Sequence, residues 1–136
     1  CHFVDLIRYL ASSQIMQIQL ITMDNFNSVS DTHSLQILFN NGSIGTINYL
    51  SNGSKAFPKE RLEVFVSGGI YRLDNFKKLS YFGSNKITLK NFLRQNKGHY
   101  ECSRSFVESI KLDMSQPIPI DQIFEVQESL LKISKL

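Results

Sequence analysis

The spacing of apolar residues predicts a helix at the start of the chain. Four apolar side chains recur three and four positions apart, as on one face of an α-helix: Phe3, Leu6, Ile7 and Leu10. We therefore expect a helix over residues 1–11. At 100° per residue, three polar side chains share a second line at or beyond the edge of this apolar stripe: His2, Asp5 and Tyr9.

Alternation with a period of two follows the helix. From Gln14 onward, Met16, Ile18 and Leu20 alternate with glutamines, which predicts a strand with one solvated face. Residues 24–32 are polar and are expected to form a loop. Two further alternating segments flank Asn-Gly, the strongest short hairpin signal, and predict two strands joined by a tight turn: Leu35, Ile37 and Phe39 before it, Ile47 and Tyr49 after it.

The second half of the chain is expected to hold a second hairpin, further strands and two helices. Residues 51–60 are rich in turn formers and form a loop. The second hairpin has arms at 62–66 and 71–73 and a turn at Gly68-Gly69, and residues 77–90 give one or two shorter strands. Helical spacing returns at 100–110, prolines at 117 and 119 interrupt it, and a last helix begins near Asp121.

This order of elements predicts the α+β class. A helix, about six strands joined mainly by hairpins and two further helices favour an open, mainly antiparallel sheet with the helices packed on one face. At 136 residues the chain has the size of one domain, spanning 1–136.

Composition narrows the function classes. The formal net charge of +3 is too small to make nucleic acid the default partner. The charge is uneven, however, because the stretch from residue 72 to residue 97 contains seven basic residues and one acidic residue, Asp74. No apolar run is long enough to cross a bilayer, so no membrane partner is expected. Cys1 and Cys102 have neither zinc-ligand nor disulfide-framework spacing, which indicates reduced thiols in a cytoplasmic protein.

His2 and Asp5 form the pair with the clearest chemical potential. A histidine in the first turn of a helix feels the positive end of the helix dipole, which favours a neutral imidazole able to act as a base. The alternative is a surface hydrogen bond to the aspartate one turn later. The chain contains no GxGxxG turn between strand and helix and no HExxH spacing, so we expect it to bind no dinucleotide by itself and no metal.

Four stretches together resemble the C-terminal domain of the Gfo/Idh/MocA oxidoreductases, the family of glucose-fructose oxidoreductase and inositol dehydrogenase. They are CHFVDLIRYL, SLQILFNNGSIGTINYLSNG, PKERLEVFVSGGIYRLDNF and the segment from GHYECSRSFVESI to QPIPIDQIFEVQESLLKIS. The segment FPKERLEVF looks closest to the corresponding segment of two-part oxidoreductases of polysaccharide biosynthesis. The resemblance spans nearly the whole chain.

The resemblance implies a function and a site. Such domains bind substrate and form oligomers in NAD- or NADP-dependent enzymes that act on a sugar or nucleotide-sugar hydroxyl. The family's DxxxHxxD-like run matches His2 and Asp5 in its second half, which makes His2 the candidate catalytic residue, while its first aspartate would precede Cys1. Asp5, Tyr9 and Lys59 are the candidate substrate-binding residues. Lys59 would reach an anionic substrate from its loop, and the alternative for it is a solvated lysine.

The same resemblance implies partners for this chain. We expect it to be a fragment that begins inside the catalytic helix, its missing partner being an N-terminal Rossmann domain that binds the cofactor. The competing interpretation is a non-catalytic binding or assembly module on the same fold. Phe65 and Ile70 lie out of phase with their strand neighbours, so an exposed apolar patch is expected on the sheet, and self-association through that sheet face follows.

Overall fold

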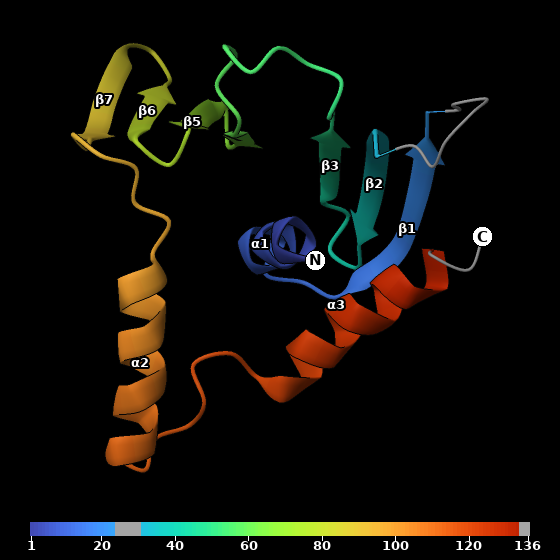
Figure 1. The fold of residues 1–136 in the computed structure, drawn as a ribbon, viewed down its shortest axis with the longest axis vertical. Coiled ribbons are helices and arrows are strands. Elements are labelled where there is room, and N and C mark those ends of the chain that lie inside the picture. Colours follow the sequence, from blue (N-terminus) through green and yellow to red (C-terminus); the bar gives the residue numbers. More distant parts are fainter. Residues whose placement is uncertain (24–30, 134–136) are drawn as a thin grey trace. The chain divides into compact units, whose positions relative to one another are not determined.

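The computed structural model describes residues 1–23 and 31–133, and most of the expected polar loop at 24–32 lies outside these ranges. The described elements, in chain order (Figure 1), are α1 (His2–Ala11), β1 (Ile15–Thr22), β2 (His33–Phe39), β3 (Ile44–Tyr49), β4 (Arg61–Val66), β5 (Gly69–Asp74), β6 (Lys78–Phe82), β7 (Lys86–Asn91), α2 (His99–Lys111) and α3 (Ile120–Ile133). The expected α+β class with open antiparallel pairing is confirmed. The strands are divided between a sheet of β1–β3 and a sheet of β4–β7.

The chain folds as two compact units. Residues Cys1–Asn52 and Met114–Leu136 make the first unit, and Gly53–Asp113 make the second. The first unit therefore contains α1, the three-stranded sheet and α3, and the second contains the four-stranded sheet and α2.

The core of the first unit lies on one face of its sheet. The antiparallel register places apolar residues in rows across the strands, such as Ile18, Ile37 and Gly45, or Leu20, Leu35 and Ile47. Ile37 and Phe39 are each only 1% exposed, and α1 and α3 pack on this face, α1 against β3 and α3 against β1 (Figure 1). The period-two pattern thus separated a covered face from an open one.

The buried face of α1 differs from the apolar stripe expected for it. Val4 and Arg8 are the most buried residues of the helix, whereas Leu10 is 43% exposed. Ile7 and Ala11 pack beside Val4 against the core. The buried side of α1 is therefore formed by Val4 and by the residues four and seven positions after it. The first of these two residues is Arg8, which is charged. Hydrophobicity alone cannot indicate this, because a buried arginine depends on its partner.

The second unit is a meander in which β4, β5, β6 and β7 pair in chain order, so residues 77–90 contribute two strands. The turn of its first hairpin lies at Ser67-Gly68, one residue before the expected Gly68-Gly69, because both Ser67 and Gly68 have positive φ and Gly69 already pairs with Val66. Gly69 is needed for space instead: a Cβ there would lie 2.5 Å from the Tyr81 ring.

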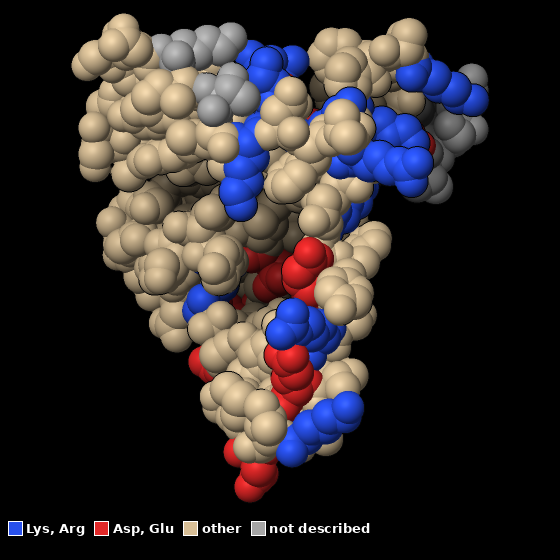
Figure 2. All heavy atoms as spheres, turned by 90° about the vertical axis from the view of Figure 1, so that its left-hand side faces the viewer, with Lys and Arg blue, Asp and Glu red and all other residues tan. Residues whose placement is uncertain are grey.

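Helix α2 of the second unit is mostly exposed along its length. Its Arg104 Nε donates to Glu108 Oε1 at 2.8 Å, and this hydrogen bond, together with the carboxylate charge, raises the pKa of Arg104. Its apolar residues Phe106, Val107 and Ile110 are all exposed. Figure 2 shows acidic and basic side chains alternating along the lower part of the face it presents.

Gly45 controls how closely α1 approaches β3. A Cβ at this position would lie 2.5 Å from Cγ2 of Ile7, which real side chains do not tolerate. We expect Gly45→Ala to lower the free energy of unfolding by about 2 kcal/mol, the usual cost of an overpacked core. Urea denaturation followed by circular dichroism measures it.

Gly53→Ala is the matched control, because no atom lies within 4 Å of a Cβ built there. It should change stability by less than about 0.5 kcal/mol. Equal effects of the two substitutions would contradict a steric role for Gly45.

Candidate functional site

The candidate residues of α1 lie on the side of the helix that faces away from the core. His2 and Tyr9 are exposed and Asp5 is half-buried, and helical geometry puts His2 almost opposite Val4 and about a third of a turn from Arg8. The imidazole of His2 contacts the ring of Phe3, with 4.2 Å between centroids. Within residues 1–23 and 31–133, no hydrogen bond or ion pair joins His2 to Asp5.

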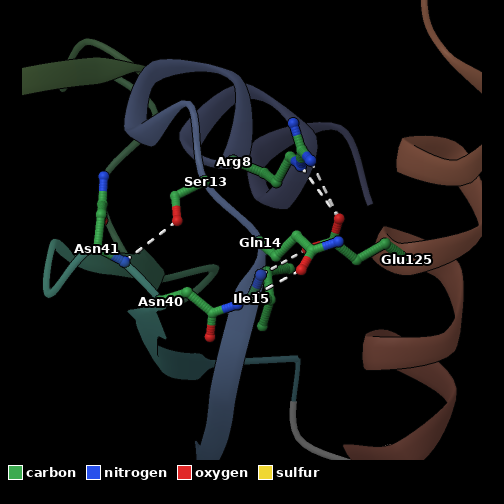
Figure 3. A network of polar contacts seen from close by, with 7 residues as sticks. All are labelled: Arg8, Ser13, Gln14, Ile15, Asn40, Asn41 and Glu125. Atoms are coloured by element: carbon green, nitrogen blue, oxygen red, sulfur yellow. Dashed lines mark hydrogen bonds and ion pairs between the residues drawn. The ribbon is translucent and has the colours of Figure 1, made fainter.

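A buried ion pair fixes the opposite side of α1 (Figure 3). Nη2 of Arg8 donates to Oε2 of Glu125 on α3 at 3.1 Å, and Nε of Arg8 donates to the same oxygen at 3.3 Å. The side chains are only 11% and 18% exposed. The second oxygen, Oε1, accepts the backbone N–H of Ile15 at the start of β1. One carboxylate therefore connects α1, β1 and α3.

The hairpin turn between β2 and β3 holds the connection that follows α1. The Asn41 backbone N–H donates to Oγ of Ser13 at 3.2 Å, and its side-chain Nδ2 donates to the carbonyl of Ala11 at 3.0 Å. The Asn40 backbone N–H donates to the carbonyl of Gln14 at 3.0 Å. Figure 3 shows Ser13, Gln14, Asn40 and Asn41 in the same region as the ion pair. The turn between β2 and β3 thus contacts both the last residue of α1 and the segment that follows it.

Lys59 lies in the loop that precedes β4, in the second unit, and it is exposed as expected. It lines an open groove of about 470 Å³. The groove is formed by the loop at residues 55–60, Asn75 in the β5–β6 turn, and Gln95 and Lys97 in the segment before α2. The structure thus brings Lys59 together with other lysines, while His2, Asp5 and Tyr9 form a separate line on α1.

The sequence alone did not indicate two contacts that the structure shows, one between Arg8 and Glu125 and one between Lys97 and Glu60. Arg8 and Glu125 are 117 positions apart, and no local pattern connects them. Lys97 was noted only as part of a basic run, yet its Nζ donates to Oε1 of Glu60 at 2.7 Å. The signal that was available is the clustering of Lys55, Lys59 and Glu60 around Pro58 in a loop long enough to carry function.

Within the described ranges, no three histidine, cysteine, aspartate or glutamate residues are grouped as ligands for a metal ion. None of the described helices is both long and apolar enough to span a bilayer.

Comparison with known proteins identifies the fold. No protein-family model and no curated protein sequence matches the chain. Among solved structures, the dehydrogenase MviM from Clostridium difficile has a TM-score of 0.83 and 20% identity, with 98% of this chain and 45% of that chain covered. The UDP-N-acetylglucosamine 3-dehydrogenase GnnA from Acidithiobacillus ferrooxidans has a TM-score of 0.81 and 12% identity, with 98% and 43% covered.

A third similar structure is the WlbA dehydrogenase from Bordetella pertussis, solved in complex with NADH and UDP-GlcNAcA. Its TM-score is 0.57 and its identity 17%, with 98% of this chain and 39% of that chain covered. The fold is therefore that of a domain of Gfo/Idh/MocA-type oxidoreductases, and the resemblance inferred from the sequence is confirmed at the level of fold. The chain spans less than half the length of these solved chains.

The Arg8–Glu125 pair leads to a test of what positions α1. We expect Glu125→Ala to lower the free energy of unfolding by about 3 kcal/mol, because it leaves the Arg8 charge buried without a partner. It also removes the acceptor of the Ile15 N–H. Urea denaturation measures the loss, and amide hydrogen exchange along α1 should become faster.

Glu128→Ala is the control on the same helix, since Glu128 is exposed. Its effect should stay below about 0.5 kcal/mol. If the two alanine variants were equally stable, the ion pair would not be what holds α1.

Proposed function

We propose that this chain is the substrate-binding and dimerisation domain of an NAD(P)-dependent oxidoreductase that acts on a hydroxyl of a sugar or nucleotide-sugar. The supporting observation is the fold, which matches dehydrogenases over 98% of the chain with an exposed histidine in the first turn of α1. The complete enzyme would be a cytoplasmic protein, and its N-terminal Rossmann domain would bind the cofactor.

The family resemblance suggests a role for each candidate residue of α1. A nicotinamide cofactor held by the other domain would exchange the hydride with the substrate carbon. His2 would accept the hydroxyl proton as the alcohol is oxidised, or return it in the reverse direction. Asp5 and Tyr9, one and two turns further along the same side of α1, would hydrogen-bond neighbouring hydroxyl groups of the sugar.

The role of His2 can be tested in the longer enzyme that contains this chain. His2→Ala should lower kcat by roughly 10²-fold, the usual contribution of a positioned general acid or base. Because His2 is exposed, its loss should leave the fold unchanged. Steady-state kinetics over pH, with circular dichroism in parallel, separates the two effects.

His99→Ala serves as the control, because His99 is an exposed residue at the start of α2. It should retain kcat within a factor of about two. An unchanged kcat in His2→Ala would instead show that His2 is a surface residue without a catalytic role.

We also propose that two copies associate through the open face of the three-stranded sheet. The register puts only uncharged residues on this face in three rows: Gln17, Leu38 and Ile44; Gln19, Gln36 and Thr46; Ile21, Ser34 and Asn48. Depletion of charge is typical of interface centres, and glutamine side chains both donate and accept hydrogen bonds across a twofold axis. The other face is already covered by α1 and α3.

The sequence pattern predicts that Phe65 lies in the interface of such a dimer. It is 71% exposed and pairs with Ile70 across β4 and β5, but its neighbours on that face are charged, including Glu63 and Arg72. This makes the face of β4–β7 that carries Phe65 less suitable as an interface centre than the uncharged face of β1–β3.

The two faces can be distinguished by sedimentation equilibrium. Gln36→Glu should shift the dimer toward monomer, since it puts an unpaired carboxylate from each copy into the interface. Gln127→Glu on the exposed side of α3 is the matched control and should leave the dimer intact. Dissociation caused by Phe65→Glu and not by Gln36→Glu would move the interface to β4–β7, and a monomeric wild type would contradict self-association.

A further inference from the structure

The positive charge of this chain is concentrated in the second unit. Residues 53–113 contain twelve of the fifteen lysine and arginine residues and six of the twelve acidic ones, a formal charge of +6, while the remainder of the chain carries −3. Figure 2 shows basic side chains gathered over the upper part of the face it presents. A local excess of this size attracts anions more strongly than the net charge suggests.

Three of these lysines line the groove described above. Lys97 is held in place, because its Nζ donates to Oε1 of Glu60 at 2.7 Å and lies 5.7 Å from the centroid of the Phe76 ring. The other oxygen of Glu60 accepts a hydrogen bond from Nε2 of Gln95 at 3.3 Å, so both carboxylate oxygens are bonded to residues that line the groove. Its side chain is only 18% exposed.

The positive charges of Lys55 and Lys59 border the groove and are not neutralised by an acidic side chain among the described residues. Neither has an ion-pair partner among the described residues, and both border the same space of about 470 Å³. The single carboxylate of the groove offsets Lys97, which leaves two uncompensated ammonium groups. Lysine binds phosphate as a point charge, and a volume of this size accepts a small ligand.

We infer that the groove lined by Lys55, Lys59 and Lys97 binds the diphosphate group of an anionic ligand. Phe57 lies between the two free lysines in the sequence, lines the same groove and is 65% exposed, so it offers an aromatic surface to the group attached to the diphosphate. The inference goes beyond the proposed function, since the groove lies in the second unit and His2 lies in the first. Binding of the diphosphate itself requires no catalysis.

Calorimetric titration of the 136-residue chain with inorganic pyrophosphate tests the site. One equivalent should bind, and Lys55→Gln/Lys59→Gln should weaken binding on the order of tenfold or more, since it removes both free charges. The control Lys111→Gln/Lys132→Gln removes the same charge from exposed positions on α2 and α3 and should change Kd by less than about twofold. Circular dichroism confirms that all variants fold.

Glu60→Gln provides a second measurement with the opposite sign. Removing the carboxylate frees the charge of Lys97, so pyrophosphate should bind more tightly, by a factor of a few. Equal weakening in the two double variants would overturn the inference, because it would show attraction to net charge alone, and so would the absence of pyrophosphate binding. Neither result involves the His2 chemistry, so the proposed oxidoreductase function is tested separately.

The nature of the ligand is resolved by two further titrations. UDP should bind more tightly than pyrophosphate if Phe57 contacts the attached nucleoside, and Phe57→Ala should remove this gain while leaving pyrophosphate binding within about twofold. A free sugar such as glucose should not compete with pyrophosphate for the groove. Competition by glucose would overturn the assignment of the groove to a diphosphate.

Discussion

The buried ion pair between Arg8 and Glu125 is the interaction on which the position of α1 depends. A guanidinium that is mostly removed from water destabilises the fold by several kcal/mol unless a carboxylate meets it, so α1 and α3 are buried together or not at all. The same carboxylate accepts the Ile15 N–H, which fixes where β1 begins relative to both helices. Since Arg8 defines the inner side of α1, it also determines that His2 lies on the outer side.

Close packing complements this polar contact. Gly45 lets α1 lie against β3 at a distance that any side chain would prevent, and Ile37 and Phe39 fill the core beneath it. The hairpin turn at Asn41 then holds the carbonyl that ends α1. The helix is thus held at its middle, beneath its length and at its end.

The local pattern of the sequence predicted most elements, and their assembly much less. Alternation located β1, β2 and β3, and the Asn-Gly pair located the turn at Gly42, because both signals act within a few residues. The expected hairpin turn at Gly68-Gly69 lies one residue later than the observed turn at Ser67-Gly68, since either glycine accepts positive φ and the pairing of Val66 with Gly69 depends on the register of the strands. The buried face of α1 and the lysine groove escaped prediction because both depend on residues far apart in the chain.

The distribution of charge gives the two units different surfaces. In the second unit a few acidic groups meet several basic ones, as where Arg61 and Arg72 share Asp74, so pairing within the fold does not explain the excess of lysines. Exposed ion pairs contribute little to stability, and unpaired lysines contribute less. The open face of β1–β3 is the reverse, with no charged residue in its three rows. A surface without charge suits contact with a copy of itself, whereas a groove with two unpaired lysines suits an anion, so the two features favour different partners.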